Sequence, residues 1–300
     1  MILYIYRAFS LLISYFCLFP SQVLRSRPGI FIFTSTLMSI EKYEQSSVAI
    51  FLFAHQDDEF GVYEQIFVEQ QRGQRIVCAY LTSGAPKGGD PIHRNRESLA
   101  VLGRLGVPAN NVVFAGALLD IADGHLVNAI QTASDWMKPW LVSFAAIRAV
   151  YVPAWEGGHP DHDVLHAVTV QLCMELGIES RVRQFPLYNA FNCTRPYFHV
   201  LSPLKENGEV DRSSIPWRRR VRFLGYALSY PSQRTSWIGL FLFFFLHHMI
   251  KGNQDLQSTS ASRIRERPHD GLLYYEHRRF SSWELLRSKL FAWLAAREVG

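Results

Sequence analysis

The sequence predicts an α/β protein with a Rossmann-like, mostly parallel sheet that is covered by helices on both faces. Short apolar runs alternate with longer helical patterns over residues 47–190, and this alternation is typical of a parallel sheet. The first run, residues 47–53, is apolar after its serine, as expected for a strand buried on both faces. No internal repeat interrupts the pattern.

The predicted elements follow in chain order. Strands are predicted at residues 47–54, 75–82, 112–115, 149–153 and 182–187, and helices at 60–71, 93–105, 126–142 and 163–175. The glycine-containing loop at residues 83–90 lacks the Gly-Lys-Ser/Thr ending and the Gly-x-Gly-x-x-Gly pattern of nucleotide-binding loops. We interpret it as a loop at the rim of the fold.

Beyond residue 188 the alternation stops, and a helical or irregular C-terminal extension is expected. Residues 217–226 are basic and amphipathic, and nine of the ten residues 237–246 are apolar. Ten residues are too few to span a bilayer, so this run predicts either a helix packed on the domain or an interfacial element with basic flanks. Residues 282–297 have apolar side chains at helical spacing, which favours a docking helix.

Length and charge suggest three segments with different properties. We expect an apolar N-terminal extension at 1–46, a core domain at 47–190 and a basic, aromatic extension at 191–300 that packs on the core. The net charge is +5, and residues 201–300 hold 16 Lys/Arg against 9 Asp/Glu. This basic third favours anionic lipid or sugar-phosphate contact. No nucleic-acid-binding module is recognisable, so nucleic acid is not expected as a partner.

The cysteines and the N-terminal residues indicate in which cellular compartment the protein is expected. Cys17, Cys78, Cys173 and Cys193 are scattered and form no Cys-x-x-Cys pair, so we expect free thiols in a reducing, cytoplasmic environment with or without membrane association. The apolar residues 1–37 are interrupted by Arg and Ser. They are either a weak membrane anchor or an extension before a domain start at Met38.

Two motifs lie directly after predicted strands. His55-Gln56-Asp57-Asp58-Glu59 follows the first strand, and His159-Pro160-Asp161-His162 follows the fourth. Ligands bind at the carboxyl ends of the strands in open α/β sheets, so these motifs are expected to meet in space. Imidazole and carboxylate are typical zinc ligands, and three such ligands with one open position are typical of a catalytic site.

These motifs resemble those of the N-acetylglucosaminyl-phosphatidylinositol de-N-acetylase family, also called PIG-L or LmbE-like deacetylases. That family shows a His-x-Asp-Asp-Glu motif and a later His-Pro-Asp-His motif. A third feature, an Arg-x-x-Glu helix start leading to Leu-Gly-Val, is matched by Arg94-Asn-Arg-Glu97 and Leu105-Gly106-Val107. The resemblance covers roughly residues 47–190. Gln56 departs from the pattern, because proline is common at that position.

The resemblance implies a zinc site and a general base. His55, Asp58 and His162 match the positions that bind Zn²⁺ in the family, and Asp57 matches the general base. The chemistry is coherent, since zinc polarises an amide and lowers the pKa of water. A carboxylate that is not bound to the metal then accepts the proton of water and passes it to the amine.

Three further roles complete the expected site. His159 matches the residue that supports the oxyanion, and we expect it to be protonated and held by Asp161. Arg94 matches a substrate-binding position; its alternative is a surface pair with Glu97 at i,i+3. His166 is expected to lie outside the ligand shell, because a fourth ligand would close the site.

The resemblance therefore implies a zinc-dependent hydrolase that removes the N-acetyl group of an N-acetylglucosamine-type sugar. The sugar is lipid-linked, part of a polysaccharide precursor or a small glycoside. Two alternatives stay open: hydrolysis of another amide, such as a glycoside of a small-thiol pathway, and a catalytically silent carbohydrate-recognition module that binds metal. Peripheral contact with a membrane is a further expectation from the basic third.

Overall fold

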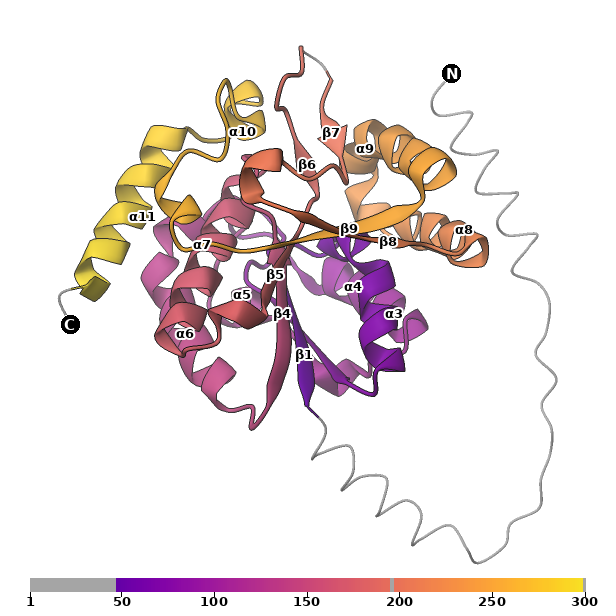
Figure 1. Ribbon diagram of the computed structural model, residues 1–300, viewed down its shortest axis with the longest axis horizontal. Coiled ribbons are helices and arrows are strands. Elements are labelled where there is room, and N and C mark those ends of the chain that lie inside the picture. The colour runs from indigo at the N-terminus through magenta and orange to yellow at the C-terminus, as the bar shows by residue number, and fades with distance from the viewer. Residues whose placement is uncertain (1–46, 195–196, 299–300) are drawn as a thin grey trace, which may run out of the picture. The chain divides into compact units, whose positions relative to one another are not determined.

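The central sheet has seven strands in the order β3-β2-β1-β4-β5-β9-β8 (Figure 1). The computed structural model describes residues 47–194 and 197–298, so the expectations for residues 1–46 lie outside the described residues. The parallel strands are β1 (Val48–Phe53), β2 (Arg75–Tyr80), β3 (Val112–Val113), β4 (Ile147–Pro153) and β5 (Val182–Phe185). The predicted mostly parallel α/β fold is confirmed.

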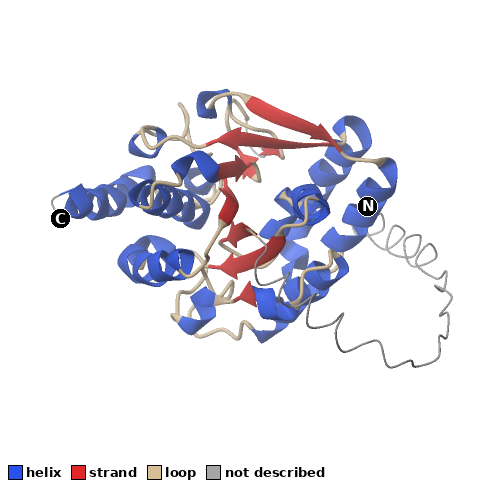
Figure 2. Cartoon of the chain, turned by 60° about the horizontal axis from the view of Figure 1, so that its bottom comes forward, coloured by secondary structure: helices blue, strands red, loops and turns tan. Residues whose placement is uncertain are grey.

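Helices cover both faces of the sheet (Figure 2). One face packs against α6 (Ile130–Val142), α7 (Pro160–Glu175) and α11 (Trp283–Glu298), and the other against α3 (Tyr63–Gln71), α4 (Ile92–Arg104), α8 (Trp217–Ala227) and α9 (Arg234–Leu246). Two short helices, α5 (Ala115–Leu118) and α10 (Tyr274–His277), lie in connections. This arrangement explains why the strands are apolar on both sides.

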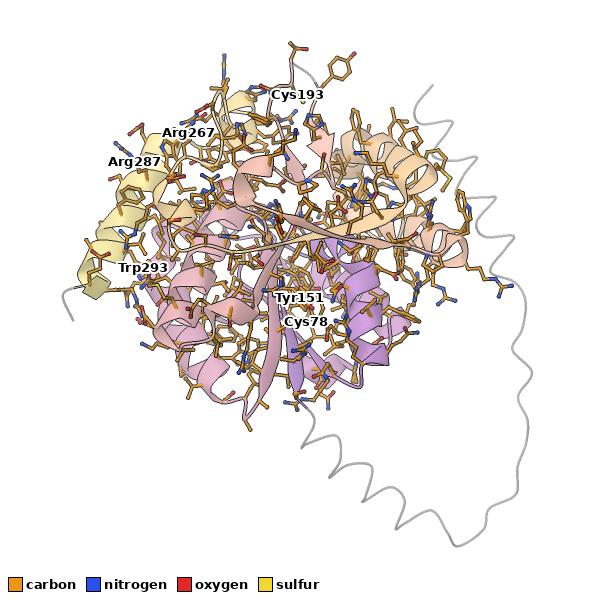
Figure 3. All side chains as sticks on the ribbon, in the orientation of Figure 1. Cys78, Tyr151, Cys193, Arg267, Arg287 and Trp293 are labelled. Carbon is orange, nitrogen blue, oxygen red and sulfur yellow. The ribbon has the colours of Figure 1, made fainter. Side chains whose placement is uncertain are left out.

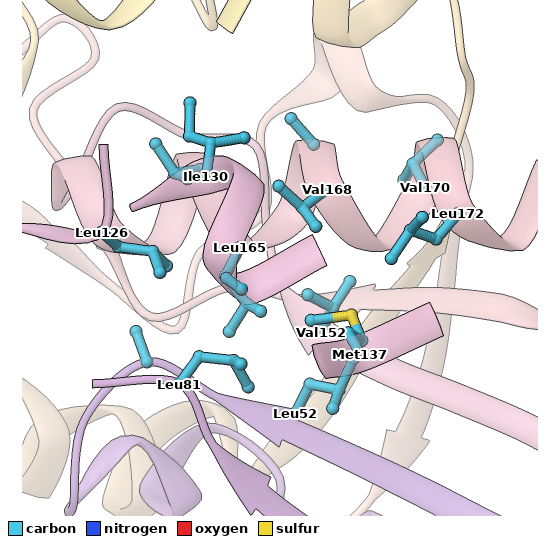
Figure 4. Packing of buried hydrophobic residues seen from close by; sticks show 14 of the residues in the cluster. Leu52, Leu81, Leu126, Ile130, Met137, Val152, Leu165, Val168, Val170 and Leu172 are labelled. Carbon is cyan, nitrogen blue, oxygen red and sulfur yellow. The ribbon is translucent and has the colours of Figure 1, made fainter. Parts of the chain in front are cut away.

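Strand β1 shows how the two cores are divided. Ile50 and Leu52 belong to the cluster that includes α6, α7 and α11, whereas Phe51 and Phe53 belong to the cluster on the opposite face. Successive side chains of a strand point to opposite faces. Figure 4 shows the first cluster, in which Leu52 packs near Met137 and Val152.

The C-terminal extension contributes strands, which the sequence analysis missed. β8 (Val210–Ser214) and β9 (Asn253–Ser258) continue the sheet in antiparallel fashion beyond β5, and β6 (Tyr188–Asn189) pairs with β7 (His199–Val200). The expectation of a helical or irregular extension is corrected on this point. β9 covers the edge of β5, whose backbone groups would otherwise be unpaired.

Chain order reverses between β1 and β4. From β1 the sheet grows through β2 and β3 on one side, and β4 and β5 are added on the other. Such a reversal leaves a crevice at the carboxyl ends of the two central strands, where ligands bind in open α/β sheets. Among the described residues, no helix combines the length and the apolar character that crossing a bilayer requires.

The described cysteines are free thiols, as expected. Cys78 and Cys173 are buried and Cys193 is partly exposed. In Figure 3, Cys78 and Tyr151 lie in the centre of the molecule and Cys193 lies at its periphery.

Candidate metal centre

The turn after β1 delivers the first motif. His55 follows the strand, and a short 3-10 helix begins at Asp58. The Oδ2 atom of Asp58 accepts the backbone N–H groups of Ala54 (2.9 Å) and His55 (2.8 Å), and Glu59 Oε2 accepts that of Asp57 (2.8 Å). The turn is therefore fixed by its own carboxylates. Glu59 supports the turn, as expected from the sequence.

The second motif begins α7. His159 is the N-cap residue, and Pro160 occupies the first helical position, where its missing N–H costs nothing. His162 then lies in the first turn, directed back over the helix N-terminus. Gly158 allows the backbone of Tyr188 to pass, because a Cβ atom at this position would lie 2.1 Å from the Tyr188 carbonyl oxygen.

Three buried donor atoms from the two motifs converge. His55 Nδ1 lies 3.2 Å from His162 Nε2, and His162 Nε2 lies 3.0 Å from Asp58 Oδ1. The distance between His55 Nδ1 and Asp58 Oδ2 is 3.7 Å. Two imidazole nitrogens and a carboxylate oxygen in one buried group suit a divalent cation such as zinc. The residues therefore fit a metal ion.

Asp58 is held in its ionised form. Burial alone would raise its pKa, but His162 and His55 outweigh burial and keep the pKa of Asp58 well below its usual range. A carboxylate that stays ionised is the form that ligates a cation.

The other ring nitrogen of His55 is held by carboxylates. His55 Nε2 lies 3.1 Å from Asp161 Oδ2 and 3.2 Å from Asp123 Oδ1. Burial lowers the pKa of His55, but Asp123, Asp161 and Asp58 outweigh burial and hold it well above its usual value. A carboxylate on the far nitrogen fixes the tautomer of a metal-binding histidine and directs its lone pair.

Asp161 does not have the geometry expected from the sequence. Its nearest imidazole partner is His55, whereas His159 Nδ1 lies 3.9 Å away. Asp161 also accepts the backbone N–H groups of Gly124 (2.7 Å) and Leu126 (3.0 Å). It is therefore placed to orient His55 and to anchor the loop before α6.

His159 also differs from the expected protonated form. Its Nδ1 atom accepts the backbone N–H of Asp161 (3.2 Å), so the proton of the neutral ring is on Nε2. Burial and the positive charge of His55 lower the pKa of His159 to about 4. The neutral ring still offers one N–H donor, and Asp123 Oδ1 lies 3.8 Å from that nitrogen.

Asp57 is next to the ligand-type residue Asp58 but is not part of the group of three donor residues. Burial, with Asp58 and Glu59 nearby, raises the pKa of Asp57 to about 8, although Arg94 opposes the shift. Its backbone has φ of 121°, a conformation that L-residues rarely adopt. Strained backbone of this kind is concentrated at functional sites, where the surrounding structure imposes it.

Arg94 lies beside Asp57, in the site rather than on the surface. Its guanidinium donates to the carbonyl oxygens of Gly84 and Gln56, and Nη2 lies 3.7 Å from Asp57 Oδ1. The alternative of a surface pair with Glu97 is wrong, because Glu97 accepts hydrogen bonds from Ser232 instead.

Two other polar residues support the site. Gln56, at the position where the family commonly has proline, donates to the Ser83 carbonyl (3.1 Å) and to Asn95 Oδ1 (2.6 Å), so it joins the rim loop to α4. His166 is buried and its Nδ1 atom lies 2.9 Å from the Pro153 carbonyl oxygen. It lies outside the ligand group, as expected.

Asp123 is a further residue of the site that was not expected from the sequence. It lies in the loop after α5, 3.2 Å from His55 Nε2 and 3.6 Å from Arg94 Nη1. With His55, His159 and Asp161 it forms a second group of metal-type donors. That group shares His55 with the first, and Asp161 in it is already occupied by two backbone N–H groups. The only sequence signal was that this loop follows the third strand, at the same edge of the sheet.

The fold and the site together define a class of protein. It has an α/β fold in which a His/Asp group suited to a metal ion lies where the strand order reverses, between β1 and β4. Residues 50–173 match the model of the GlcNAc-PI de-N-acetylase (PIG-L) family. The chain therefore contains a PIG-L, LmbE-like deacetylase domain over these residues, and the resemblance seen in the sequence is confirmed. No curated protein sequence matches the chain significantly.

Solved structures share the fold at low sequence identity. A triple mutant of the deacetylase Orf2 from the teicoplanin biosynthetic pathway has a TM-score of 0.55 and 18% identity, covering 71% of this chain and 98% of that one. The zinc-inhibited form of teicoplanin deacetylase Orf2 has a TM-score of 0.52 and 15% identity, covering 71% and 99%. At these identities the likeness concerns the fold alone.

Proposed function

We propose that the protein is a zinc-dependent hydrolase that removes the N-acetyl group from an N-acetylglucosamine-type sugar. The observation that carries this proposal is a largely buried carboxylate, Asp57, directly next to a group of three converging metal-type donors. Membership in a deacetylase family supports the reaction type. Solved structures that share the fold are described as deacetylases of the teicoplanin biosynthetic pathway, one of them in a zinc-inhibited form.

His55, Asp58 and His162 would hold the metal ion. A bound zinc ion supplies Lewis acidity toward the amide carbonyl and a lowered pKa for water. Asp161 and Asp123 would keep the proton of His55 on Nε2, so that Nδ1 presents its lone pair. Removing either histidine should therefore reduce metal content, which is measurable without any assay of turnover.

Asp57 would act as the general base and then as the general acid. Its carboxylate is largely buried and is not part of the donor group. A cation held by the neighbouring donors would lower the raised pKa of Asp57, so that the ionised carboxylate would accept a proton from water. The same proton is then passed to the departing amine, and acetate and the free amino sugar are released. The Nε2–H group of His159 would donate to the oxygen that becomes negative in the tetrahedral intermediate.

Arg94 would bind the substrate, as the family position implies. The Nε atom of Arg94 is buried and makes no hydrogen bond within the described part of the chain. The same guanidinium already links the rim loop to Asp57. Under this proposal Arg94 both binds the substrate and holds the general base Asp57 in place.

Release of acetate from a panel of N-acetylglucosaminyl substrates tests the proposed function. The panel contains an inositol phospholipid, a chitin disaccharide and a small glycoside. Turnover should disappear on chelation, return with Zn²⁺ and remain absent in Asp57→Asn. Full zinc occupancy with no turnover on any member would support the silent carbohydrate-binding alternative, and turnover confined to other amides would redefine the substrate.

A further inference from the structure

Helix α9 carries apolar side chains on its outer face. Ile238, Leu242, Leu246 and Ile250 follow one another at intervals of four residues, the last on the π-helical turn His247–Lys251 that continues the helix. These four residues are 42%, 56%, 40% and 77% exposed, in this order. Residues four apart lie on the same face of a helix, so they form a continuous apolar stripe.

The inner face of α9 is apolar as well, and it is this face that packs on the domain. Trp237 and Phe244 are buried against Phe60, with ring centroids 5.3 and 5.7 Å apart. The alternative of a helix packed on the domain is thus confirmed for the inner face, and the interfacial alternative stays a prediction for the outer face. A surface helix of a water-exposed domain normally has polar side chains on its outer face. The outer stripe of α9 consists of apolar side chains instead.

The chain segment that contains the stripe is basic, and the acidic residues Glu64 and Glu97 that contact it are bound to Arg219 and Ser232. Residues 212–254 contain seven Arg and Lys residues and no Asp or Glu. Arg234 and Lys251 are exposed at the two ends of the stripe. Helix α8, which contacts the π-helical turn, adds exposed Arg218 and Arg222.

Some of the arginines of α8 are already bound to other parts of the protein. Arg219 pairs with Glu64 at 2.9 Å, and Arg220 donates to the carbonyl oxygens of Ile215 and His248. For Arg218 and Arg222, the described part of the chain provides no hydrogen bond or ion pair. These two cations are therefore available to an external anionic partner.

A chain of aromatic rings connects α9 with the candidate metal centre. The ring of His162 lies 5.6 Å from that of Tyr188, Tyr188 lies 6.4 Å from Phe198, and Phe198 lies 5.0 Å from Phe243 on α9. Only two rings thus separate a proposed metal ligand from this helix. A partner seated on α9 would be close to the site.

We propose that α8 and α9 form a docking surface for an anionic membrane. An apolar stripe bordered by exposed arginine and lysine suits the interface of an anionic bilayer, where the apolar groups insert and the cations meet phosphate. A second copy of the chain fits less well, because a symmetric contact through α9 would bring the cations of both copies together. Nucleic acid would leave the apolar stripe uncovered.

The docking surface has a consequence for the lipid-linked substrate that the proposed function already includes. If the protein deacetylates an amino sugar as proposed above, then a sugar attached to a lipid would be presented within reach of the site while its acyl chains stay in the bilayer. The docking surface itself stands without that function, because binding to vesicles is measured without turnover.

Flotation of the full chain with vesicles tests the docking surface. The chain should bind phosphatidylcholine vesicles that contain phosphatidylserine more strongly than pure phosphatidylcholine vesicles, and salt should weaken this binding. The double variant Arg218→Gln/Arg222→Gln should reduce the partition coefficient by on the order of thirtyfold. The double variant Leu242→Gln/Leu246→Gln should reduce it by roughly tenfold or more.

Matched controls lie on α11, away from this surface. Leu285 is 44% exposed and Arg287 pairs with Glu284 on the same helix, so Leu285→Gln/Arg287→Gln should bind vesicles like the parent. In Figure 3 Arg287 lies on α11, on the opposite side of the molecule from α9. Unchanged circular dichroism would show that all variants are folded.

Three results would overturn the proposal. They are equal vesicle binding by the α8–α9 and α11 variants, equal binding of neutral and anionic vesicles, and self-association of the parent that the leucine variant abolishes. If docking is correct and the substrate is lipid-linked, the α8–α9 variants should lose turnover of vesicle-embedded substrate but keep that of a soluble glycoside. Vesicle binding without turnover of any substrate would overturn the function and leave the docking surface standing.

Discussion

Asp57 and Asp58 are neighbours in one turn, but their carboxylates have different electrostatic surroundings. Asp58 lies against two imidazoles that keep its pKa low, whereas burial and neighbouring carboxylates raise the pKa of Asp57 to about 8. The left-handed φ of Asp57 turns successive side chains in different directions. The spacing in the sequence allowed either aspartate to be the metal ligand. Only the family resemblance assigned the ligand role to Asp58 and the general-base role to Asp57.

Substitution of the two aspartates should separate metal binding from catalysis. Asp57→Asn should keep about one zinc per chain and lose activity by roughly a hundredfold or more, the scale of general acid–base catalysis. Asp58→Asn should lose zinc as well, because it removes a ligand. Zinc content is measured by atomic absorption after dialysis. If only the Asp57 variant lost zinc, Asp57 would be the metal ligand and Asp58 the general base.

The backbone of Asp57 provides a second test at this scale. Asp57→Gly and Asp57→Ala both remove the carboxylate, but only glycine adopts φ of 121° without strain. We expect the glycine variant to have a free energy of unfolding about 1–2 kcal/mol higher than the alanine variant, measured in urea. At ordinary positions alanine is the more stable of the two. An alanine variant that is equally stable would mean that the turn relaxes without cost.

At the scale of elements, the connection from β4 to α7 is held by a buried acid. Glu156 accepts the backbone N–H groups of Leu187 (2.6 Å) and Tyr188 (2.9 Å) and the side chain of Asn189 (3.1 Å). Burial raises the pKa of Glu156 from 4.5 to about 7 in spite of these donors. The ionised form of this group is therefore unfavourable in the folded protein.

The raised pKa predicts a pH dependence of stability. The folded protein binds this proton more tightly than the unfolded chain, so the stabilisation is complete below pH 4.5 and is lost as the pH rises through about 7. The loss amounts to at most about 3 kcal/mol. Glu156→Gln should flatten this part of the profile, measured by urea unfolding at several pH values. Glu284→Gln, at an exposed glutamate, should leave the profile unchanged.

Elements with a hydrophobic pattern were predictable from the sequence, and those without one were not. The five parallel strands and the helices α4, α7 and α11 lie where the apolar spacing places them. β9 has the sequence Asn-Gln-Asp-Leu-Gln-Ser and is nevertheless buried. Asp255 is paired with Arg212 at 2.8 Å, and the Gln257 side chain donates to two backbone carbonyls. Buried polar groups with partners leave no signal in an apolar pattern.

At the scale of the whole molecule, topology decides what the sequence reveals of the site. The two motifs lie about a hundred residues apart, and parallel strands bring their ends to one edge, so their meeting was predictable. Asp123 comes from a loop with no motif, and its contact with His55 depends on how that loop folds back. The pairing of Asp161 with His55 rather than His159 likewise depends on side-chain geometry that residue spacing does not determine.

The C-terminal helix tests whether the extension and the parallel sheet unfold together. Leu290 on α11 is fully buried in the same apolar cluster as strands β1 and β4, whereas Leu285 on the same helix is 44% exposed. Leu290→Ala should lower the free energy of unfolding by about 2–5 kcal/mol, because it leaves a cavity in the shared core. Leu285→Ala should change it by no more than about 0.5 kcal/mol. Circular dichroism and tryptophan fluorescence should report one transition that shifts as a whole in the Leu290 variant. If instead a separate early transition appeared, and only this transition shifted in the Leu290 variant, α11 would unfold independently of the sheet.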